Sequence, residues 1–231
     1  MLARRGYDWR ETAVVLIVGI GAVVVMSVTR HVVGTSEFDL LVGDPLAVAR
    51  AGGDIDYVAV GWITHLVIIM WAVAAMSGAA GARLRWDDPE RRREALMFGA
   101  SGLLSLGLLV DDLFQVHESV FPIWFGVDEK RTMAAWAVLA LMWFAVFSRL
   151  LVRNRHLPLV VLAGLFLAAS IAVDVLEDAG PLGPLTDLVG GAGVAEDGPK
   201  LVGVFAWAVF HWRAAVSSLV DRGDRMTIAA P

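Results

Sequence analysis

Long runs of apolar residues are the feature that most constrains how this chain can fold. The run from Thr12 to Val28 has almost no polar side chain, and several later runs approach the roughly 20 residues that a bilayer-crossing helix needs. Hydrophobic residues make up 58% of the chain, whereas soluble domains usually contain about 45–50%. The sequence therefore predicts an all-α integral membrane protein.

The apolar runs predict six transmembrane helices within a single polytopic membrane domain covering residues 1–231. The first run is long for a signal peptide and is expected to be retained as a span. The connector 30–56 carries too many charges to cross, although part of it is expected to lie in the interface. Residues 180–194, rich in Gly and Pro, are expected to form a loop or a re-entrant segment. The expected spans are 11–29, 57–80, 94–118, 132–152, 157–178 and 197–219.

The distribution of basic residues predicts the orientation of these spans. With six spans, most of the 19 basic residues fall on the side that holds both termini. Because positive residues are retained on the cytoplasmic side, both termini are expected to be cytoplasmic. Basic positions are almost all arginine, which is typical of a high-GC bacterial genome and hence favours a bacterial plasma membrane.

Acidic residues gather at the ends of three spans, and the span count places all three ends on the outer side. A charge one or two turns inside a span costs about 2.5 kcal/mol near the centre and less toward the rim, so buried acids on separate helices suggest mutual compensation. By helical phase, Asp111, Gln115 and Glu118 share one face, with Asp112 and His117 on its flanks. The alternative is that these acids only mark the water boundary. The ionisable residues at these three ends are Asp111, Asp112, His117 and Glu118; Asp174, Glu177 and Asp178; and Glu196, Asp197 and Lys200.

We expect these outer ends to form one site. The predicted catalytic residues are Asp111, Glu118, Asp174 and Lys200. His65 and His211 are candidates for a polar path, and each has the simpler reading of a buried structural histidine. The predicted metal ligands are Asp111, Asp112, His117, Glu118, Asp174, Glu177, Asp178 and Glu196.

The ligand chemistry favours a hard divalent cation. The chain has no cysteine, so a metal would be held by carboxylate oxygen and imidazole nitrogen, which suits Fe, Mn, Mg or Ca. Carboxylates and histidines on neighbouring helices are the ligands of metal sites built inside helical bundles. The sequence thus predicts a metal-dependent membrane enzyme, an oxidoreductase or a hydrolase, acting on a lipophilic substrate near the outer leaflet.

Three other functions stay open at this point. Intramembrane Asp, Glu and His can mark the route of a proton- or cation-coupled transporter or channel. The same acids could work without metal, as general acid and base on a lipid or isoprenoid. The acidic mouth could also dock a protein partner in an assembly. The expected partners are the lipid bilayer and a lipophilic molecule or an ion, with no nucleic acid, and the oligomeric state is left open.

Overall fold

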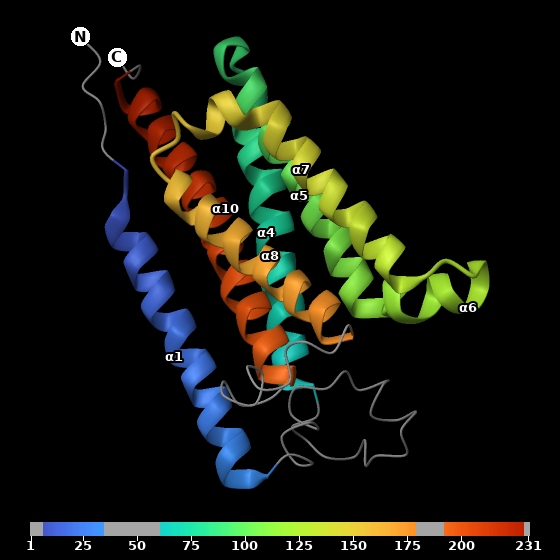
Figure 1. The fold of residues 1–231 in the computed structure, drawn as a ribbon. Coiled ribbons are helices and arrows are strands. Elements are labelled where there is room, and N and C mark those ends of the chain that lie inside the picture. The colour runs from blue at the N-terminus through green and yellow to red at the C-terminus, as the bar shows by residue number, and fades with distance from the viewer. Residues whose placement is uncertain (1–6, 35–60, 179–191, 229–231) are drawn as a thin grey trace. The chain divides into compact units, whose positions relative to one another are not determined.

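Six helices of the computed structural model are long and apolar enough to cross a membrane, which makes the chain an all-α, multi-pass membrane protein (Figure 1). The structure describes residues 7–34, 61–178 and 192–228. The expected interfacial segment within 30–56 and most of the expected loop 180–194 lie outside these residues. The six helices are α1 (Trp9–Val33), α4 (Trp62–Trp86), α5 (Arg92–Phe114), α7 (Glu129–Leu151), α8 (Leu157–Asp178) and α10 (Ala192–Ile228).

The predicted spans are confirmed in number, and their ends differ in two places that matter. α5 ends at Phe114, four residues before the expected end of the span 94–118. α10 begins at Ala192 rather than 197 and continues to Ile228, so residues 192–194 are helical and not part of a loop. Hydropathy detects the apolar part of a helix, while polar turns beyond it remain helical because their hydrogen bonds are satisfied within the helix.

The described chain divides into two compact units that are interleaved along the sequence. The first unit comprises residues 1–8, 70–159 and 207–231, and the second comprises 9–69 and 160–206. Helices α4 and α10 each contribute to both units. Each unit is considered by itself below, and the single membrane domain stays a prediction.

In the second unit, glycines bring α10 close to its neighbours. A Cβ at Gly19 of α1 would lie 2.8 Å from Val202, and a Cβ at Gly203 would lie 2.8 Å from Leu167 of α8. Met26 and Val194 are buried where α1 meets the start of α10. Small residues at such crossings let helices pack closely in a membrane.

In the first unit, α5 packs against α4 on one side and α7 on the other. Gly78 and Gly102 allow α4 and α5 to touch, since a Cβ at Gly78 would lie 2.8 Å from the Cα of Gly102. Gly107 of α5 receives the ring of Trp136 from α7, where a Cβ would lie 2.5 Å from Cη2. Figure 1 shows α5 and α7 side by side, with the short helix α6 (Phe121–Phe125) at one end of the pair.

A buried histidine braces α10 to α5 within this unit. His211 is fully buried, with Nδ1 2.9 Å from the Trp207 carbonyl and Nε2 2.8 Å from the Ser101 hydroxyl. A carbonyl only accepts, so Nδ1 carries the proton, and Nε2 of the neutral ring accepts from Ser101. One turn away, the Trp207 indole N–H donates to the Ser105 hydroxyl at 2.8 Å. The brace therefore fixes the contact between the two helices at two successive turns.

Replacing Ser101 by Ala is expected to lower the free energy of unfolding by about 1–3 kcal/mol, because the buried His211 Nε2 loses its donor. The matched control is Ser218→Ala, since the buried Ser218 hydroxyl donates to the Ala214 carbonyl of its own helix. We expect the control to cost about 0.5 kcal/mol or less, as Ala is the better helix former. Denaturant unfolding in detergent micelles measures both, and equal losses would contradict the brace.

The two ends of α7 are expected to be accessible to a thiol reagent from opposite sides of the membrane. Arg131 and Arg153 are exposed near its two ends, and the 23 residues of α7 span about 35 Å, enough to cross the hydrocarbon. The natural chain has no cysteine, so Arg131→Cys and Arg153→Cys each create one reactive site. A membrane-impermeant maleimide on intact cells should label only one of the two variants. Both should react after detergent permeabilisation, and equal labelling of intact cells would refute the span.

Candidate functional site

The site begins where α5 stops. Gln115 adopts a left-handed conformation, with φ 49° and ψ 47°, and its backbone N–H closes the helix by donating to the Asp111 carbonyl. A π-helical turn, η2 (Val116–Val120), and then α6 follow. A left-handed residue ends a helix because it turns the chain away from the helix axis. The straight helix expected through residue 118 is therefore wrong beyond Phe114, and so is the face on which Glu118 was grouped with Asp111.

This turn folds His117 back onto Asp111. The Asp111 carboxylate is buried, with 3% of the residue exposed. Its Oδ1 accepts the backbone N–H of His117 at 3.0 Å, and its Oδ2 lies 2.8 Å from His117 Nδ1. The contact between Nδ1 and Oδ2 is an ion pair, and its geometry is not that of a hydrogen bond. The ion pair and the backbone hydrogen bond together hold His117 against Asp111, while Nε2 lies on the side of the neighbouring glutamates.

Two further carboxylates lie beside the Nε2 atom of His117. Glu118 Oε1 is 3.5 Å away and Glu129 Oε1 is 4.0 Å away. The Gln115 side chain donates to the other oxygen of Glu118 at 3.0 Å. Both glutamates are nearly half exposed, so Nε2 lies at the boundary between the buried Asp111 and a more open, acidic mouth.

Glu129 was not among the sequence candidates. It is the first residue of α7, and Asp128 caps this helix by accepting the backbone N–H of Lys130 at 2.9 Å. The hairpin between α5 and α7 returns the chain to the level of His117. An acid at the start of the following span was the available signal, because antiparallel neighbours joined by a short segment meet at their ends.

Asp112 is tied to α4. Its Oδ2 accepts the indole N–H of the buried Trp71 at 2.8 Å. Asp111, Asp112 and His117 each offer one ligand atom, and these atoms all lie within 4.8 Å of one another. The break at Gln115 thus brings His117, expected on the flank of the helical face, back to Asp111 and Asp112 at the end of α5.

Buried polar atoms without a hydrogen-bond partner surround this hairpin. Among the described residues they include Gln115 Oε1, Thr132 Oγ1 and Trp136 Nε1. Thr132 and Trp136 follow Glu129 at helical spacing along α7. A buried polar group left unpaired costs about 1–3 kcal/mol, so a concentration of them suggests a place built for a polar ligand.

The donor set fits a hard divalent cation. Two ligand atoms that are each about 2.0–2.2 Å from one ion lie about 3–3.5 Å apart. The 3.5 Å from Nε2 to Glu118 matches this spacing, and the 4.0 Å to Glu129 exceeds it. The group whose ligand atoms all lie within 4.8 Å of one another is Asp111, Asp112 and His117. The set is one imidazole and carboxylates, which suits Fe, Mn or Mg. Asp111 would then be the outer carboxylate that orients the ligating histidine.

The other predicted site residues belong to the second unit. Asp174 of α8 and Glu196 and Lys200 of α10 are half-buried there. Glu177 and Asp178 form the last residues of α8, and their side chains lie outside the described ones. Their meeting with the Asp111–His117 pair stays a prediction.

The two histidines of the expected polar path differ in their surroundings. His65 is exposed, with Nδ1 2.6 Å from the Gly61 carbonyl of the preceding turn. His211 is the buried brace between α5 and α10. Both contact a backbone carbonyl, but only His211 is the buried structural histidine of the alternative interpretation, and the polar path stays a prediction.

The fold and site define a multi-pass helical membrane protein with a buried carboxylate–histidine pair at one end of a span. The chain belongs to the family described as a domain of unknown function, DUF8692, whose model matches residues 12–214. The matched region includes the whole α5–α7 hairpin and the His211 brace. No curated protein and no solved structure matches the chain.

Proposed function

We propose that this protein is a membrane-embedded enzyme that uses a divalent metal ion, with its reaction centre on the Asp111–His117 pair. The observation that carries the proposal is the pair's geometry. Asp111 holds His117 by both its ring and its backbone, and Nε2 lies beside Glu118 and Glu129. Such preorganisation is what a metal ligand or a general base requires.

In this proposal the chain's own groups have distinct tasks. Asp111 holds the ring and the backbone of His117 in place. Glu118 and Glu129 supply oxygen ligands, or take a proton from the substrate, at the open side. A bound divalent ion would supply Lewis acidity at this mouth. Asp112 is held through Trp71, so that α4 supports the same end of α5.

A lipophilic substrate is favoured by the surroundings of the mouth. α6 carries three exposed apolar residues in a row, Ile123, Trp124 and Phe125, which are 67%, 78% and 69% exposed. Aromatic residues of this kind sit at the level of the lipid headgroups. A lipid or isoprenoid could approach the Asp111–His117 pair from the bilayer along this helix.

The charge distribution supports an orientation for this enzyme. The turn between α4 and α5 and the turn between α7 and α8 are rich in arginine. By the positive-inside rule these turns and both termini face the cytoplasm, and the Asp111–His117 pair faces the outside of a bacterial plasma membrane. The Arg131→Cys variant should then be the one that labels in intact cells.

Proton or cation transfer is the second candidate. It is favoured by the buried polar groups of Ser101, Ser105 and His211, which lie on α5 and α10 inside the span. However, the Nδ1 proton of His211 is donated to the Trp207 carbonyl, and a carbonyl oxygen cannot pass a proton onward. We therefore prefer the enzyme. Proton or cation flux in proteoliposomes that depends on His211 would favour transport over the enzyme.

Metal binding should depend on the Asp111–His117 pair. We expect Mn²⁺, Mg²⁺ or Fe²⁺ to raise the melting temperature of the purified full chain. Asp111→Asn should weaken this metal affinity by about 10–100-fold, as for other residues that orient a ligand. His117→Gln should abolish the effect. The measurement is a melting curve against metal concentration, after treatment with a chelator.

The control for charge is Glu90→Gln, an exposed acid at the far end of α5. It should leave the affinity unchanged. Equal metal affinity in Asp111→Asn and the unmodified chain would overturn the assigned site. A chain that binds no metal, yet loses activity in His117→Gln, would establish the metal-free acid–base version.

Enzymatic action on a lipid should be visible in whole membranes. Cells expressing the unmodified chain should accumulate or lose one lipid or isoprenoid species, compared with cells expressing His117→Gln at the same level. Glu90→Gln should reproduce the pattern of the unmodified chain. Mass spectrometry of lipid extracts makes the comparison, and identical lipid profiles in all three strains would contradict the enzyme.

A further inference from the structure

The opposite end of the first unit contains a pocket lined with arginine. Its volume is about 430 Å³, within the range of about 300–1,000 Å³ that small-molecule pockets have. The walls come from the end of α4, the turn before α5, the α7–α8 turn and α10. None of the described lining residues is acidic. The polar lining residues are Arg85, Arg91, Asn154, Arg155, His156, Arg213 and Ser217.

One of these arginines holds the pocket together. Arg85 is 4% exposed and donates to the Gly81 carbonyl at 2.9 Å, the Ala214 carbonyl at 3.0 Å and Glu94 at 3.0 Å. Its guanidinium also lies 4.4 Å from the centre of the Phe98 ring. These contacts join α4, α5 and α10, so the wall behind the pocket is fixed.

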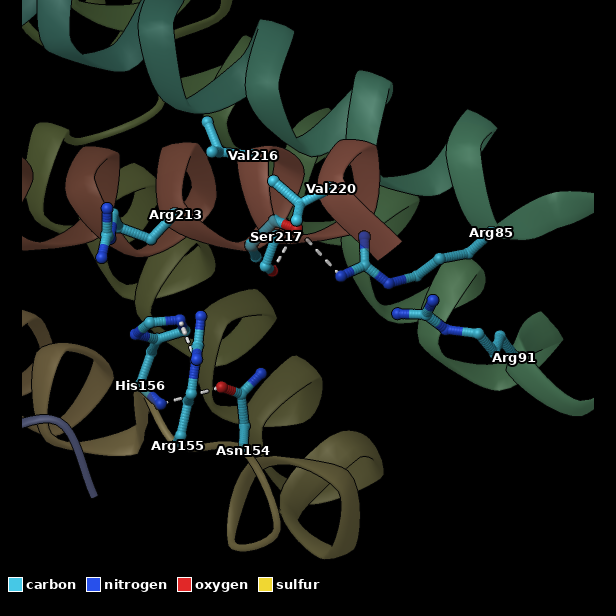
Figure 2. A pocket seen from close by; sticks show the side chains of 10 residues that line it. Arg85, Arg91, Asn154, Arg155, His156, Arg213, Val216, Ser217 and Val220 are labelled. Carbon is cyan, nitrogen blue, oxygen red and sulfur yellow. Dashed lines mark hydrogen bonds between the residues drawn. The ribbon is translucent and has the colours of Figure 1, made fainter. Parts of the chain in front are cut away.

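The other three arginines are more accessible. Arg91, Arg155 and Arg213 are each partly exposed. In Figure 2, Arg85 and Arg91 extend toward Ser217 from one side, and Arg155 rises beside His156. Glu94 is also bonded to Arg91 at 3.3 Å, so one carboxylate lies at this edge.

The histidine of the pocket adds no positive charge near neutral pH. Burial and, to a smaller extent, the adjacent Arg155 lower the pKa of His156 to about 4, and Asp8 opposes them. The neutral ring accepts the Arg155 Nε–H at Nε2, at 3.0 Å. This contact fixes the direction of the Arg155 side chain in the α7–α8 turn.

We propose that this arginine pocket binds a phosphate group, carried either by a phospholipid headgroup or by a soluble phosphate ester. Glu94 offsets part of the charge of Arg85 and Arg91, and the four guanidinium groups around the cavity still carry an excess of positive charge that an anion would balance. Guanidinium forks match phosphate oxygens in pairs. The hydroxyl of Ser217 and the amide of Asn154 supply further uncharged groups for hydrogen bonding. The pocket is separate from the Asp111–His117 pair, because α5 rises about 29 Å from Arg92 to Asp111.

Binding can be measured on the purified full chain in a maltoside detergent, which contains no phosphate. The probes are glycerol 3-phosphate, phosphatidylglycerol and phosphatidylcholine, titrated by calorimetry or native mass spectrometry. Binding of glycerol 3-phosphate supports the soluble source, and binding of phosphatidylglycerol alone supports the lipid source. Phosphatidylcholine should bind more weakly, because its choline cation offsets the phosphate charge.

Substitutions locate the site. Arg155→Gln should weaken binding of the active probe about tenfold or more, the loss expected for a charge-assisted hydrogen bond. Arg153→Gln is the matched control, since Arg153 is exposed in the same turn and does not line the pocket; its affinity should stay within about twofold of the unmodified chain, because a distant exposed charge is screened. If Arg155→Gln fails to fold, Arg213→Gln takes its place.

Arg155→Lys should fall between the unmodified chain and Arg155→Gln, because it keeps the charge and loses the planar fork. The proposal is overturned if neither glycerol 3-phosphate nor phosphatidylglycerol binds. It is also overturned if Arg153→Gln and Arg155→Gln lose the same affinity, which is the signature of non-specific attraction. Neither result bears on metal binding at His117, so the two proposals fail separately.

Discussion

A carboxylate buried inside a membrane protein needs neighbours that replace its lost water, and the Asp111 side chain obtains them from residues six positions ahead in its own chain. Both of its oxygens are engaged by His117, one by the backbone and one by the ring. This is possible only because α5 stops at Phe114. Continued as a helix, residue 117 would point well away from Asp111. The solvation of one acid thus explains the break, the π-helical turn and the hairpin to α7.

The first unit is organised around α5 as an axis with different chemistry at its two ends. One end holds the Asp111–His117 pair with the acidic mouth, and the other holds the arginine pocket. Between them the contacts are aromatic and tightly packed. The Trp143 indole N–H donates to the Met97 carbonyl at 3.1 Å, and the Trp143 ring packs edge-on against Trp207. A rigid middle keeps the two ends in fixed relation within the unit.

The number and the approximate limits of the spans follow from hydropathy, because the bilayer imposes a length that the sequence must match. The candidate site was predictable only in composition. Asp111, Asp112 and His117 are recognisable as charges in an apolar segment, but periodicity assumes an unbroken helix. Nothing at Gln115 announces the left-handed turn, since the residue is neither Gly nor Asn. The arginine pocket was missed for a different reason. In the sequence its arginines were used only to predict the orientation of the spans. The burial of Arg85 depends on tertiary packing, which the periodicity of the sequence does not reveal.

Gly107 affects the spacing of the side chains at the acidic mouth. With only hydrogen as a side chain, it lets the Trp136 ring lie directly on the α5 backbone. Trp136 stands two turns into the helix that begins with Glu129. The absence of a Cβ at Gly107 therefore sets the distance between α5 and α7. It thereby also sets the distance between Glu129, at the start of α7, and the imidazole of His117.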